Sequence, residues 1–305
     1  MRVLITGGAG YVGTELSYEL ESNADVEEVI IYDNLSRGSF NFFLGRSKFH
    51  KKTTFIHGDL LDTRKLKRAL VGVDIVCHLA AKVTTPFADQ DPHLFEQINH
   101  WGTAELVYAV EESDVKRFIY LSSASVYGAS LQVVSVESPT APITFYSISK
   151  KRGEEHVNRL FGSEIETYII RCGNVYGYSK SMRFNSVINR FVFQAHFKNL
   201  ITIDGDGEQN RSFIHIDKTA NILAAVIDGE LEQGTYDLVE DTLSVNFIAN
   251  TLREIYPGLE LLYVNQRLNL HQLKVKADPR INSLTSIEVR SLKQVLTKFK
   301  EQFTF

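Results

Sequence analysis

The chain has 305 residues, of which 44% are hydrophobic and 23% charged, with a formal net charge of −4, and this is the composition of an ordinary globular protein. Because a polyanion binder needs a basic excess, we do not expect a nucleic-acid partner. The sequence has no run of 18 apolar residues. Its first predicted strand is entered at Arg2, which leaves no room for a secretory signal before it. We therefore expect a cytoplasmic protein with no membrane partner.

In chain order, short apolar runs first alternate with helix-length amphipathic segments. This alternation is typical of βαβ units and a parallel sheet. The predicted strands are 3–6, 28–33, 53–59, 74–80, 117–123 and 166–172. The predicted helices are about 11–22, 62–71, 93–113 and 145–161. With right-handed crossovers, the expected fold is α/β, a doubly wound parallel sheet of Rossmann type.

From about residue 178 the alternation becomes less regular. Further helices are predicted near 184–196, 218–228 and 244–255, and short strands near 201–203 and 235–239. We expect these elements to form a smaller C-terminal α/β lobe. The predicted domains are therefore 1–177, the Rossmann-type domain, and 178–305, the smaller lobe, with interleaved boundaries.

The two cysteines, Cys77 and Cys172, lie in or beside apolar strand-like runs. This placement indicates buried reduced thiols rather than a disulfide or a metal site. The sequence also contains no Cys/His cluster with ligand spacing, so no metal is predicted.

The stretch TGGAGYVG at 6–13 follows a predicted strand and opens a predicted helix. Gly8, Gly10 and Gly13 fit the G-x-G-x-x-G spacing, in which glycines allow a tight turn and close approach of backbone amides to a pyrophosphate. Asp33 follows Gly13 by 20 residues and ends the next strand. A carboxylate there accepts hydrogen bonds from a ribose 2′-OH and repels a 2′-phosphate, which favours NAD over NADP. Arg37 leaves NADP open, since a nearby arginine can bind that phosphate, and a purely structural turn is the alternative to a nucleotide site.

A second group of residues suggests chemistry. Tyr146 and Lys150 are four apart at the start of a predicted helix and therefore share a face. Ser123 ends a predicted strand, where it would point into the crevice used by ligands of such sheets. An ordinary tyrosine titrates near pH ~10, so a base near neutrality needs its anion stabilised by roughly 4 kcal/mol. A lysine ammonium can supply part of that, although Y-x-x-x-K alone is also common as an exposed helix pair.

Taken in order, these motifs resemble the extended short-chain dehydrogenase/reductases, specifically the NAD-dependent nucleotide-sugar epimerase/dehydratase family. The resemblance covers nearly the whole chain, and it implies that 1–177 binds NAD and carries the catalytic residues, whereas 178–305 is the substrate-binding lobe. The motifs that carry it are TGGAGYVG (6–13), YDNLSRG (32–38), GDLLD (58–62), HLAA (78–81), NHWGT (99–103), LSSASVYG (121–128), YSISK (146–150), RCGNVYG (171–177), DGDGEQNRSFIHIDKTA (204–220) and SLKQVL (291–296).

The resemblance implies roles for individual positions. It makes Ser123, Tyr146 and Lys150 the catalytic residues. It assigns NAD binding to Gly7, Gly10, Tyr11, Val12, Asp33, Asn34, Asp59, Leu60, Leu79, Ala80, Ala81, Lys82, Tyr146 and Lys150. It assigns the nucleotide-diphosphate sugar to Thr84, Ser123, Ser125, Asn174, Arg211 and Arg267. Alternatives stay open for three of these residues. Asn174 could be a turn residue, and Arg211 could belong to a surface ion pair. Lys82 could contact the substrate or the cofactor, or it could be solvated.

The implied reaction is oxidation of a sugar at C4 to a transient ketone, which an epimerase then reduces on the other face. Dehydratase and decarboxylase relatives carry acidic residues after the catalytic Ser or Thr, and here those positions are Ala124 and Ser125. We therefore expect an epimerase. The alternatives are a C4 dehydrogenase or reductase that stops at one half reaction, and a non-catalytic NAD-binding sensor.

Departures from the family pattern concentrate on the substrate side. Tyr178 stands where proline is usual after NVYG, Lys218 replaces a second acid, and Arg267 lacks the usual Gly-Asp after it. The Ala277-Asp278 pair lacks the leucine-glycine that usually follows. By resemblance we also expect a homodimer, paired through the helices near 93–113 and 145–161. Apolar residues of these helices could form that interface or face the sheet: Leu106, Val107, Val110 and Val157.

Overall fold

The computed structural model describes residues 1–38, 40–44, 52–83, 91–264, 272–285, 287–288 and 290–303. Two predicted substrate-binding residues, Thr84 and Arg267, lie outside the described residues. Within the described part of the chain, no helix is long and apolar enough to cross a membrane.

The larger part of the molecule is built on a seven-stranded sheet in the order β11-β7-β5-β4-β1-β2-β3. Every neighbouring pair in it is parallel. Its strands are β1 (Arg2–Thr6), β2 (Glu28–Asp33), β3 (Thr53–His57), β4 (Ile75–His78), β5 (Arg117–Ser123), β7 (Glu166–Cys172) and β11 (Gly234–Leu238). The prediction of a doubly wound α/β fold is confirmed, and the carboxyl ends of the strands meet at one edge, where such folds bind ligands.

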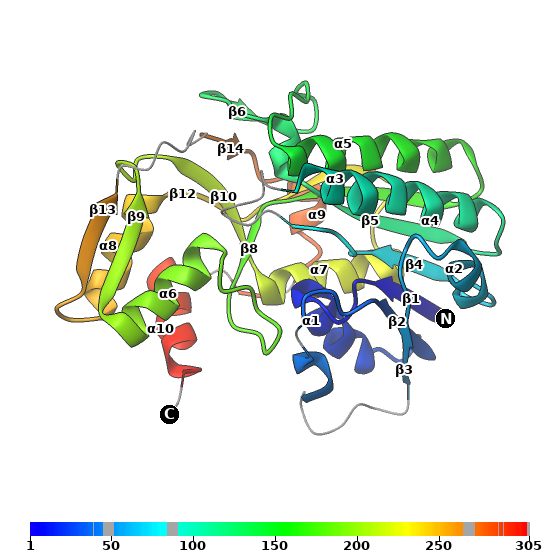
Figure 1. Cartoon of the computed structure of the whole chain (residues 1–305), viewed down its shortest axis with the longest axis horizontal. Coiled ribbons are helices and arrows are strands. Elements are labelled where there is room, and N and C mark those ends of the chain that lie inside the picture. Colours follow the sequence, from blue (N-terminus) through cyan, green and yellow to red (C-terminus); the bar gives the residue numbers. More distant parts are fainter. Residues whose placement is uncertain are drawn as a thin grey trace.

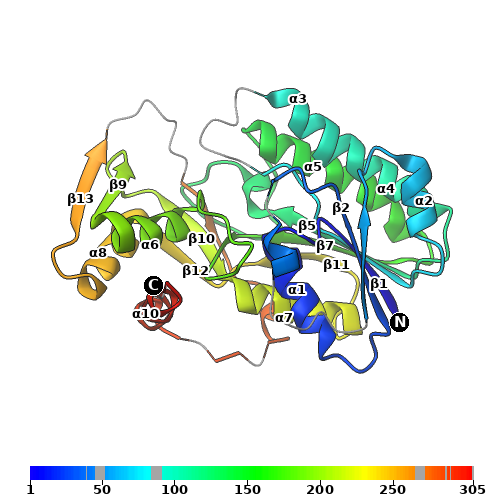
Figure 2. The same cartoon turned by 60° about the horizontal axis from the view of Figure 1, so that its bottom comes forward.

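Helices cover both faces of this sheet, as Figures 1 and 2 show. On one face lie α1 (Tyr11–Glu21) and α7 (Ile216–Asp228), and on the other lie α2 (Thr63–Ala69), α4 (Gly102–Glu111) and α5 (Phe145–Val157). Successive residues of β1 show why both faces are buried. Val3 and Ile5 pack in the core under α1 and α7, whereas Leu4 packs in the core under α2 and α4.

The helix predicted over 93–113 is divided into three segments. It begins as α3 (Pro92–Phe95), continues through a π-helical turn over Glu96–Trp101, and ends as α4. A π turn shifts the side chains that follow it around the axis, and such turns are frequent at functional sites. Asn99 lies in this turn and is buried.

The smaller lobe has its own core at the other end of the molecule, on the left in Figure 1. Its strands are β8 (Asn174–Tyr176), β9 (Leu200–Asp204), β10 (Asn210–His215), β12 (Asp241–Ser244) and β13 (Glu260–Val264). Its helices are α6 (Val187–Lys198), α8 (Val245–Ile255) and α10 (Leu292–Glu301). Further short elements are β6 (Val133–Val134), β14 (Lys274–Val275) and α9 (Pro279–Asn282).

Two elements that we expected in the smaller lobe belong to the larger sheet. β11 pairs with β7 along Gly234–Leu238, and α7 packs against α1. The chain therefore leaves the large sheet after β7 and returns to it, and the apolar residues of α7 and β11 are buried there in the core shared with α1. The division into 1–177 and 178–305 remains a prediction.

Candidate functional site

The glycine loop lies between β1 and α1 and is fixed by close backbone packing. Gly7 has a φ of +70°, and a Cβ there would lie 2.6 Å from the Cα of Ala80. A Cβ at Gly13 would lie 2.5 Å from the Cα of Gly8. Gly10 begins α1 without any side-chain cap, which leaves the first amides of the helix to bind a ligand. The loop thus fits the pyrophosphate of a dinucleotide.

Asp33 at the end of β2 lies beside this loop, as the sequence predicted. Its carboxylate accepts hydrogen bonds from the backbone amides of Ala9 (3.1 Å) and Leu35 (2.7 Å). Burial raises the pKa of Asp33, and these two amides act against that shift. Further along the same edge, Asn34 donates to the carboxylate of Asp59 at 2.7 Å.

The turn after β4 brings the predicted residues Leu79, Ala80, Ala81 and Lys82 to the same edge. The Leu79 amide donates to the Thr6 carbonyl at 3.0 Å, and Leu60 is buried nearby in the core under α2. The Lys82 side chain is exposed. Its backbone, however, is held from both sides, since its amide donates to the Oδ1 of Asn99 (2.7 Å) and its carbonyl accepts from Asn99 Nδ2 (2.9 Å).

Asn99 is a site residue that the sequence reasoning did not single out. Its amide also donates to Ser149 on α5 at 3.0 Å, so one buried side chain joins the turn after β4 to the helix that carries Tyr146 and Lys150. The signal available in the sequence was an asparagine within an otherwise helical run in NHWGT. A buried amide must find hydrogen-bond partners, and only the fold supplies them.

Ser123 ends β5 and caps the short helical turn Ala124–Tyr127. Its hydroxyl lies 2.8 Å from that of Ser125, and the Ser123 side chain acts on Tyr146 to lower the pKa of that residue. The predicted Ser123, Ser125 and Tyr146 therefore lie near one another at the carboxyl edge of the sheet.

Tyr146 and Lys150 lie in the first two turns of α5, which begins at a Thr144–Ser147 capping box. Burial raises the pKa of Tyr146, whereas the Ser123 side chain lowers it. The Lys150 ammonium lies 4.1 Å from the centre of the Tyr120 ring and is 2% exposed. Burial lowers the pKa of Lys150 to about 7. Both groups thus have acid–base properties different from those of an exposed helix pair.

A loop of the smaller lobe approaches the same place. Arg183 acts electrostatically on Tyr146 and favours its anion. Tyr11, directly after the glycine loop, is buried and donates from its hydroxyl to the carbonyl of Gly177 at 2.5 Å. Arg37 donates to the carbonyl of Ser181 at 3.2 Å. Arg183 was not predicted, because nothing in its local sequence connects it to a residue 37 positions earlier.

The predicted diphosphate residues lie on neighbouring strands, Asn174 on β8 and Arg211 on β10. Asn174 is exposed, and its amide donates to the Ser212 carbonyl at 3.0 Å. Burial lowers the pKa of Arg211, and the charge of Arg190 on α6 lowers it further. Arg190 pairs with Asp204 at 3.2 Å. Within the described residues the buried Nε atoms of both arginines have no hydrogen-bond partner, and a bound anion is one kind of group that can satisfy such donors.

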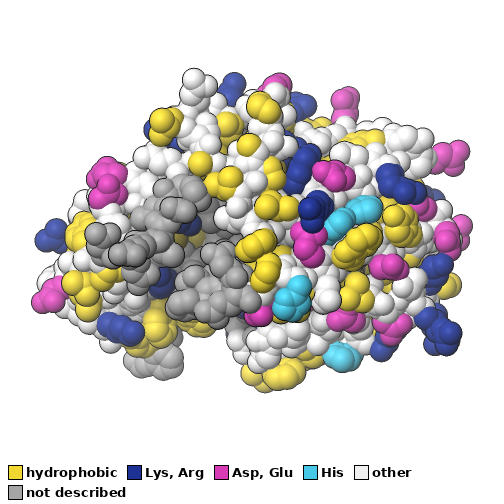
Figure 3. Space-filling model, turned by 45° about the horizontal axis from the view of Figure 1, so that its top comes forward, with side chains coloured by type: hydrophobic (Ala, Val, Ile, Leu, Met, Phe, Trp, Pro, Cys, Tyr) yellow, Lys and Arg dark blue, Asp and Glu magenta, His cyan; other side chains and the backbone are white. Residues whose placement is uncertain are grey.

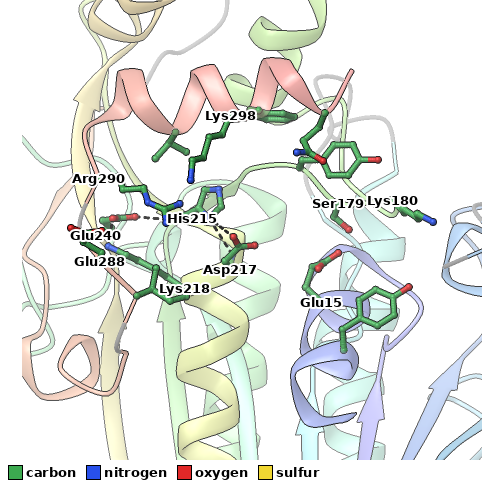
Figure 4. A pocket seen from close by; sticks show the side chains of 16 residues that line it. Glu15, Ser179, Lys180, His215, Asp217, Lys218, Glu240, Glu288, Arg290 and Lys298 are labelled. Atoms are coloured by element: carbon green, nitrogen blue, oxygen red, sulfur yellow. Dashed lines mark hydrogen bonds and ion pairs between the residues drawn. The ribbon is translucent and has the colours of Figure 1, made fainter. Parts of the chain in front are cut away.

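A separate cavity of about 280 Å³ lies between α1, the start of α7 and α10 (Figure 4). Among its charged side chains, Lys218 pairs with Glu240, and His215 Nδ1 lies 3.7 Å from the Asp217 carboxylate. None of the predicted site residues lines it. The predicted site residues described above therefore lie at the carboxyl edge of the sheet and not in this cavity.

The sheet order, the glycine loop and the acid at the end of β2 define a dinucleotide-binding α/β protein of Rossmann type. Residues 3–238 match the model of the NAD dependent epimerase/dehydratase family, and the chain belongs to that family. NAD is therefore the cofactor.

Curated relatives include a putative UDP-glucose 4-epimerase of Methanocaldococcus jannaschii, 32% identical over 73% of this chain and 72% of its own length. A mouse dTDP-D-glucose 4,6-dehydratase is 30% identical over 75% of this chain and 65% of its own length. The relatives therefore include both reaction types.

Solved structures show the same fold. A dTDP-glucose 4,6-dehydratase of Streptomyces venezuelae, solved with NAD bound, superposes with a TM-score of 0.89 at 24% identity, covering 99% of this chain and 97% of that one. A UDP-glucuronic acid 4-epimerase of Bacillus cereus, in complex with UDP-glucuronic acid and NAD, has a TM-score of 0.85 at 24% identity and covers 100% of both chains.

Proposed function

We propose that the protein is an NAD-dependent nucleotide-sugar epimerase that works through a transient 4-keto sugar. The observation that carries the proposal is the placement of Ser123 near Tyr146 beside a buried Lys150, with Ala124 and Ser125 in the two positions after Ser123. Neither Ala124 nor Ser125 can serve as the additional acid that water elimination needs.

In this proposal Tyr146 is the general base that takes the proton of the sugar hydroxyl at C4. NAD would be held by the glycine loop and Asp33 and, when bound, would supply reversible hydride transfer at that carbon. Ser123 hydrogen-bonds the same oxygen as charge develops on it. Tyr146 must work as its anion, and its pKa is raised by burial, so nearby positive charge is required. Arg183 acts electrostatically on Tyr146 to favour its anion, and we assign the same role to Lys150, four residues further along α5.

The substrate would be a nucleotide-diphosphate sugar. Arg211 is suited to its diphosphate because a guanidinium offers a planar fork of donors and its Nε has no partner within the described residues. Arg190 lies near enough to act on Arg211 electrostatically, and within the described residues it pairs with one carboxylate, that of Asp204. We therefore assign Arg190 and Asn174 to the same subsite. Several relatives are named for UDP or dTDP sugars, which agrees with this class.

We also propose that the protein pairs with a second copy through the outer face of α4 and α5. Leu106, Val107, Val110 and Val157 are all fully buried under the sheet and are not available for an interface. Trp101, at 54% exposure, and Tyr108, at 37%, face outward instead. Figure 3 shows hydrophobic and histidine side chains gathered on this face among charged ones. Light scattering tests the expected mass of a dimer.

The reaction is tested with purified protein and four probes, UDP-glucose, UDP-N-acetylglucosamine, UDP-glucuronic acid and dTDP-glucose. We expect the C4 epimer of at least one to appear by NMR without added cofactor, and denatured protein to release NAD⁺ in near stoichiometric amount. Formation of a 4-keto-6-deoxy sugar would overturn the epimerase in favour of a dehydratase. A released cofactor that is mostly reduced would favour the half reaction, a C4 dehydrogenase or reductase.

A further inference from the structure

Two histidines outside the proposed site bring their ring nitrogens close together. His100 lies in the π-helical turn Glu96–Trp101, and His156 lies 56 positions later in the last turn of α5. Their Nε2 atoms are 3.1 Å apart, and the two rings stack with centres 5.1 Å apart and planes inclined by 30°. Both side chains are half-buried. The reaction proposed above uses neither of them.

The hydrogen-bond partners of the pair fix where its protons lie. His100 Nδ1 is 3.0 Å from Glu96 Oε2, and an ionised carboxylate only accepts hydrogen bonds, so His100 donates from Nδ1. In the neutral ring, His100 Nε2 then carries a lone pair, and His156 Nε2 donates to it. A nitrogen that can ligate a metal therefore already faces a second imidazole.

The carboxylate behind His100 is an independent sign of a metal site. Glu96 is itself fixed by Arg152 on α5, whose Nη1 lies 2.7 Å from the same Oε2. Metal-bound histidines almost always donate their other ring N–H to a carboxylate, a backbone carbonyl or water, which sets the tautomer and orients the ring. His100 has this arrangement, with its free nitrogen directed at His156.

The separation of the two nitrogens suits one shared ion. An ion about 2.0 Å from each of two imidazole nitrogens holds them about 3.3 Å apart in tetrahedral geometry and about 2.9 Å apart with ligands at right angles. The observed 3.1 Å lies between these values. To bind, His156 carries its single proton on Nδ1 instead of Nε2, so both Nε2 lone pairs face the ion and no proton is released.

The donor atoms indicate the class of metal. Imidazole nitrogens suit Zn²⁺, Ni²⁺ and Cu²⁺, whereas Mg²⁺ and Ca²⁺ prefer oxygen ligands. In the described part of the chain no group of three or more His, Cys, Asp or Glu side chains is placed to hold a metal, so the chain supplies two ligands and water the others. The nearby arginines are paired with carboxylates, Arg152 with Glu96 at 2.7 Å and Arg159 with Glu111 at 3.1 Å, so they do not exclude a dication.

We propose that His100 and His156 together bind one transition-metal dication of the Zn²⁺, Ni²⁺ and Cu²⁺ class, with Glu96 orienting His100. A bound ion clips the π-helical turn to α5, the two elements that the buried Asn99–Ser149 hydrogen bond also joins. This face of the molecule is the one proposed above for pairing with a second copy. Both ligands come from one chain, so the metal site does not depend on that pairing.

Trp101, the single tryptophan of the chain, reports on this site directly. Its ring stacks on that of His100 with the centres 4.6 Å apart. A Ni²⁺ ion bound to the neighbouring imidazole quenches indole fluorescence, whereas Zn²⁺ does not. In tag-free protein stripped of metal, we expect Ni²⁺ to quench Trp101 at one ion per chain and excess Zn²⁺ to restore the signal. Calorimetric titration with Zn²⁺ then gives the Kd without relying on Trp101.

His156→Gln removes one ligand and leaves Trp101 stacked on His100. It should raise the Kd for Zn²⁺ by at least about tenfold, since even the loss of a group behind a ligating histidine typically costs that much. His100→Gln should weaken Zn²⁺ binding as strongly, and calorimetry follows it because this change alters the surroundings of Trp101. His93→Gln is the matched control, because His93 is an exposed histidine of the preceding helix α3, and the Kd should stay unchanged.

The NAD content of each purified variant shows that it has folded, and the two ligand variants test the site independently of each other. An equal Kd for Zn²⁺ in wild type, His156→Gln and His100→Gln would overturn the metal site, as would wild-type protein without saturable Zn²⁺ binding. Equal weakening by His93→Gln would also overturn it, because binding would then be spread over surface histidines. Turnover of the probe sugars is not among these measurements, so failure of the proposed epimerase reaction would leave the metal site standing.

Discussion

The glycine loop, at Gly7 and Gly13, is shaped by close backbone packing. The substrate side of the site, at Arg190 and Arg211, is shaped by buried charges instead. On the cofactor side, an added Cβ would meet main-chain atoms at 2.5 to 2.6 Å, so hardly any other side chain is tolerated. On the substrate side, the guanidiniums of Arg190 and Arg211 lie near the carboxylate of Asp204, which pairs with Arg190. The Nε atoms of both arginines have no hydrogen-bond partner within the described residues. A site shaped by backbone packing suits a cofactor that is common to a whole family. A site shaped by charged side chains can be altered by exchanging a few residues, which suits a lobe that selects the substrate.

The largest expected effect lies between these two regions, at Tyr146. Tyr146→Phe removes the proposed base but leaves the ring packed, so turnover should fall by about 10²–10⁴-fold while NAD stays bound. Turnover of the active probe sugar and the cofactor released on denaturation measure the two parts. Full turnover in this variant would remove the catalytic assignment.

Arg211→Gln tests the substrate side, where buried charges shape the site. Loss of a charge-assisted pair of hydrogen bonds to the diphosphate should raise KM for the nucleotide sugar roughly 10- to 100-fold and change kcat little, since the group is bound alike before and during reaction. The free protein should not lose stability, because the variant relieves the repulsion from Arg190. Arg253→Gln on the exposed surface of α8 is the control. An unchanged KM would place the diphosphate elsewhere.

Gly13→Ala tests the cofactor side, where close backbone packing shapes the glycine loop. A methyl group 2.5 Å from the Gly8 Cα forces the loop to move, which should cost about 2 kcal/mol of stability and weaken NAD binding. Thermal unfolding and NAD titration report the two effects. Gly162→Ala is matched to it, because a Cβ at Gly162 meets nothing within 4 Å. Equal behaviour of the two variants would contradict the close packing of the loop.

The smallest effect concerns pH. Burial raises the pKa of Asp237 to about 7, above its ordinary value near ~3.9. The folded state therefore binds a proton that the unfolded state releases between those values, and stability contributed by Asp237 falls as pH rises through this window. Asp237→Asn should be more stable than wild type at pH 8 by about 1 kcal/mol and should lose that advantage near pH 4. Unfolding in urea at both pH values measures this, and a constant difference would contradict it.

Much of the larger sheet could be predicted from the sequence because its signals are local. β2, β5 and β7 begin and end at the predicted residues, and the glycine loop and Asp33 lie side by side as the spacing implied. The assignment of β11 to the large sheet could not be predicted, since a five-residue strand carries no mark of its partner. Asn99 and Arg183 were missed for the same reason, because their roles depend on neighbours brought near by the fold.

The hydrogen bond from Tyr11 to the Gly177 carbonyl joins residues 166 positions apart, one next to the cofactor loop and the other where the chain enters the smaller lobe. Asn189 of α6 donates to the same Tyr11 hydroxyl at 3.4 Å and accepts from the Gly177 amide at 3.0 Å. A shift of the cofactor loop on binding NAD would therefore be passed to the smaller lobe, which receives the nucleotide sugar. Thermodynamic linkage makes such coupling equal in both directions, so a nucleotide sugar would tighten its hold on NAD by the same factor as NAD tightens the hold on the sugar.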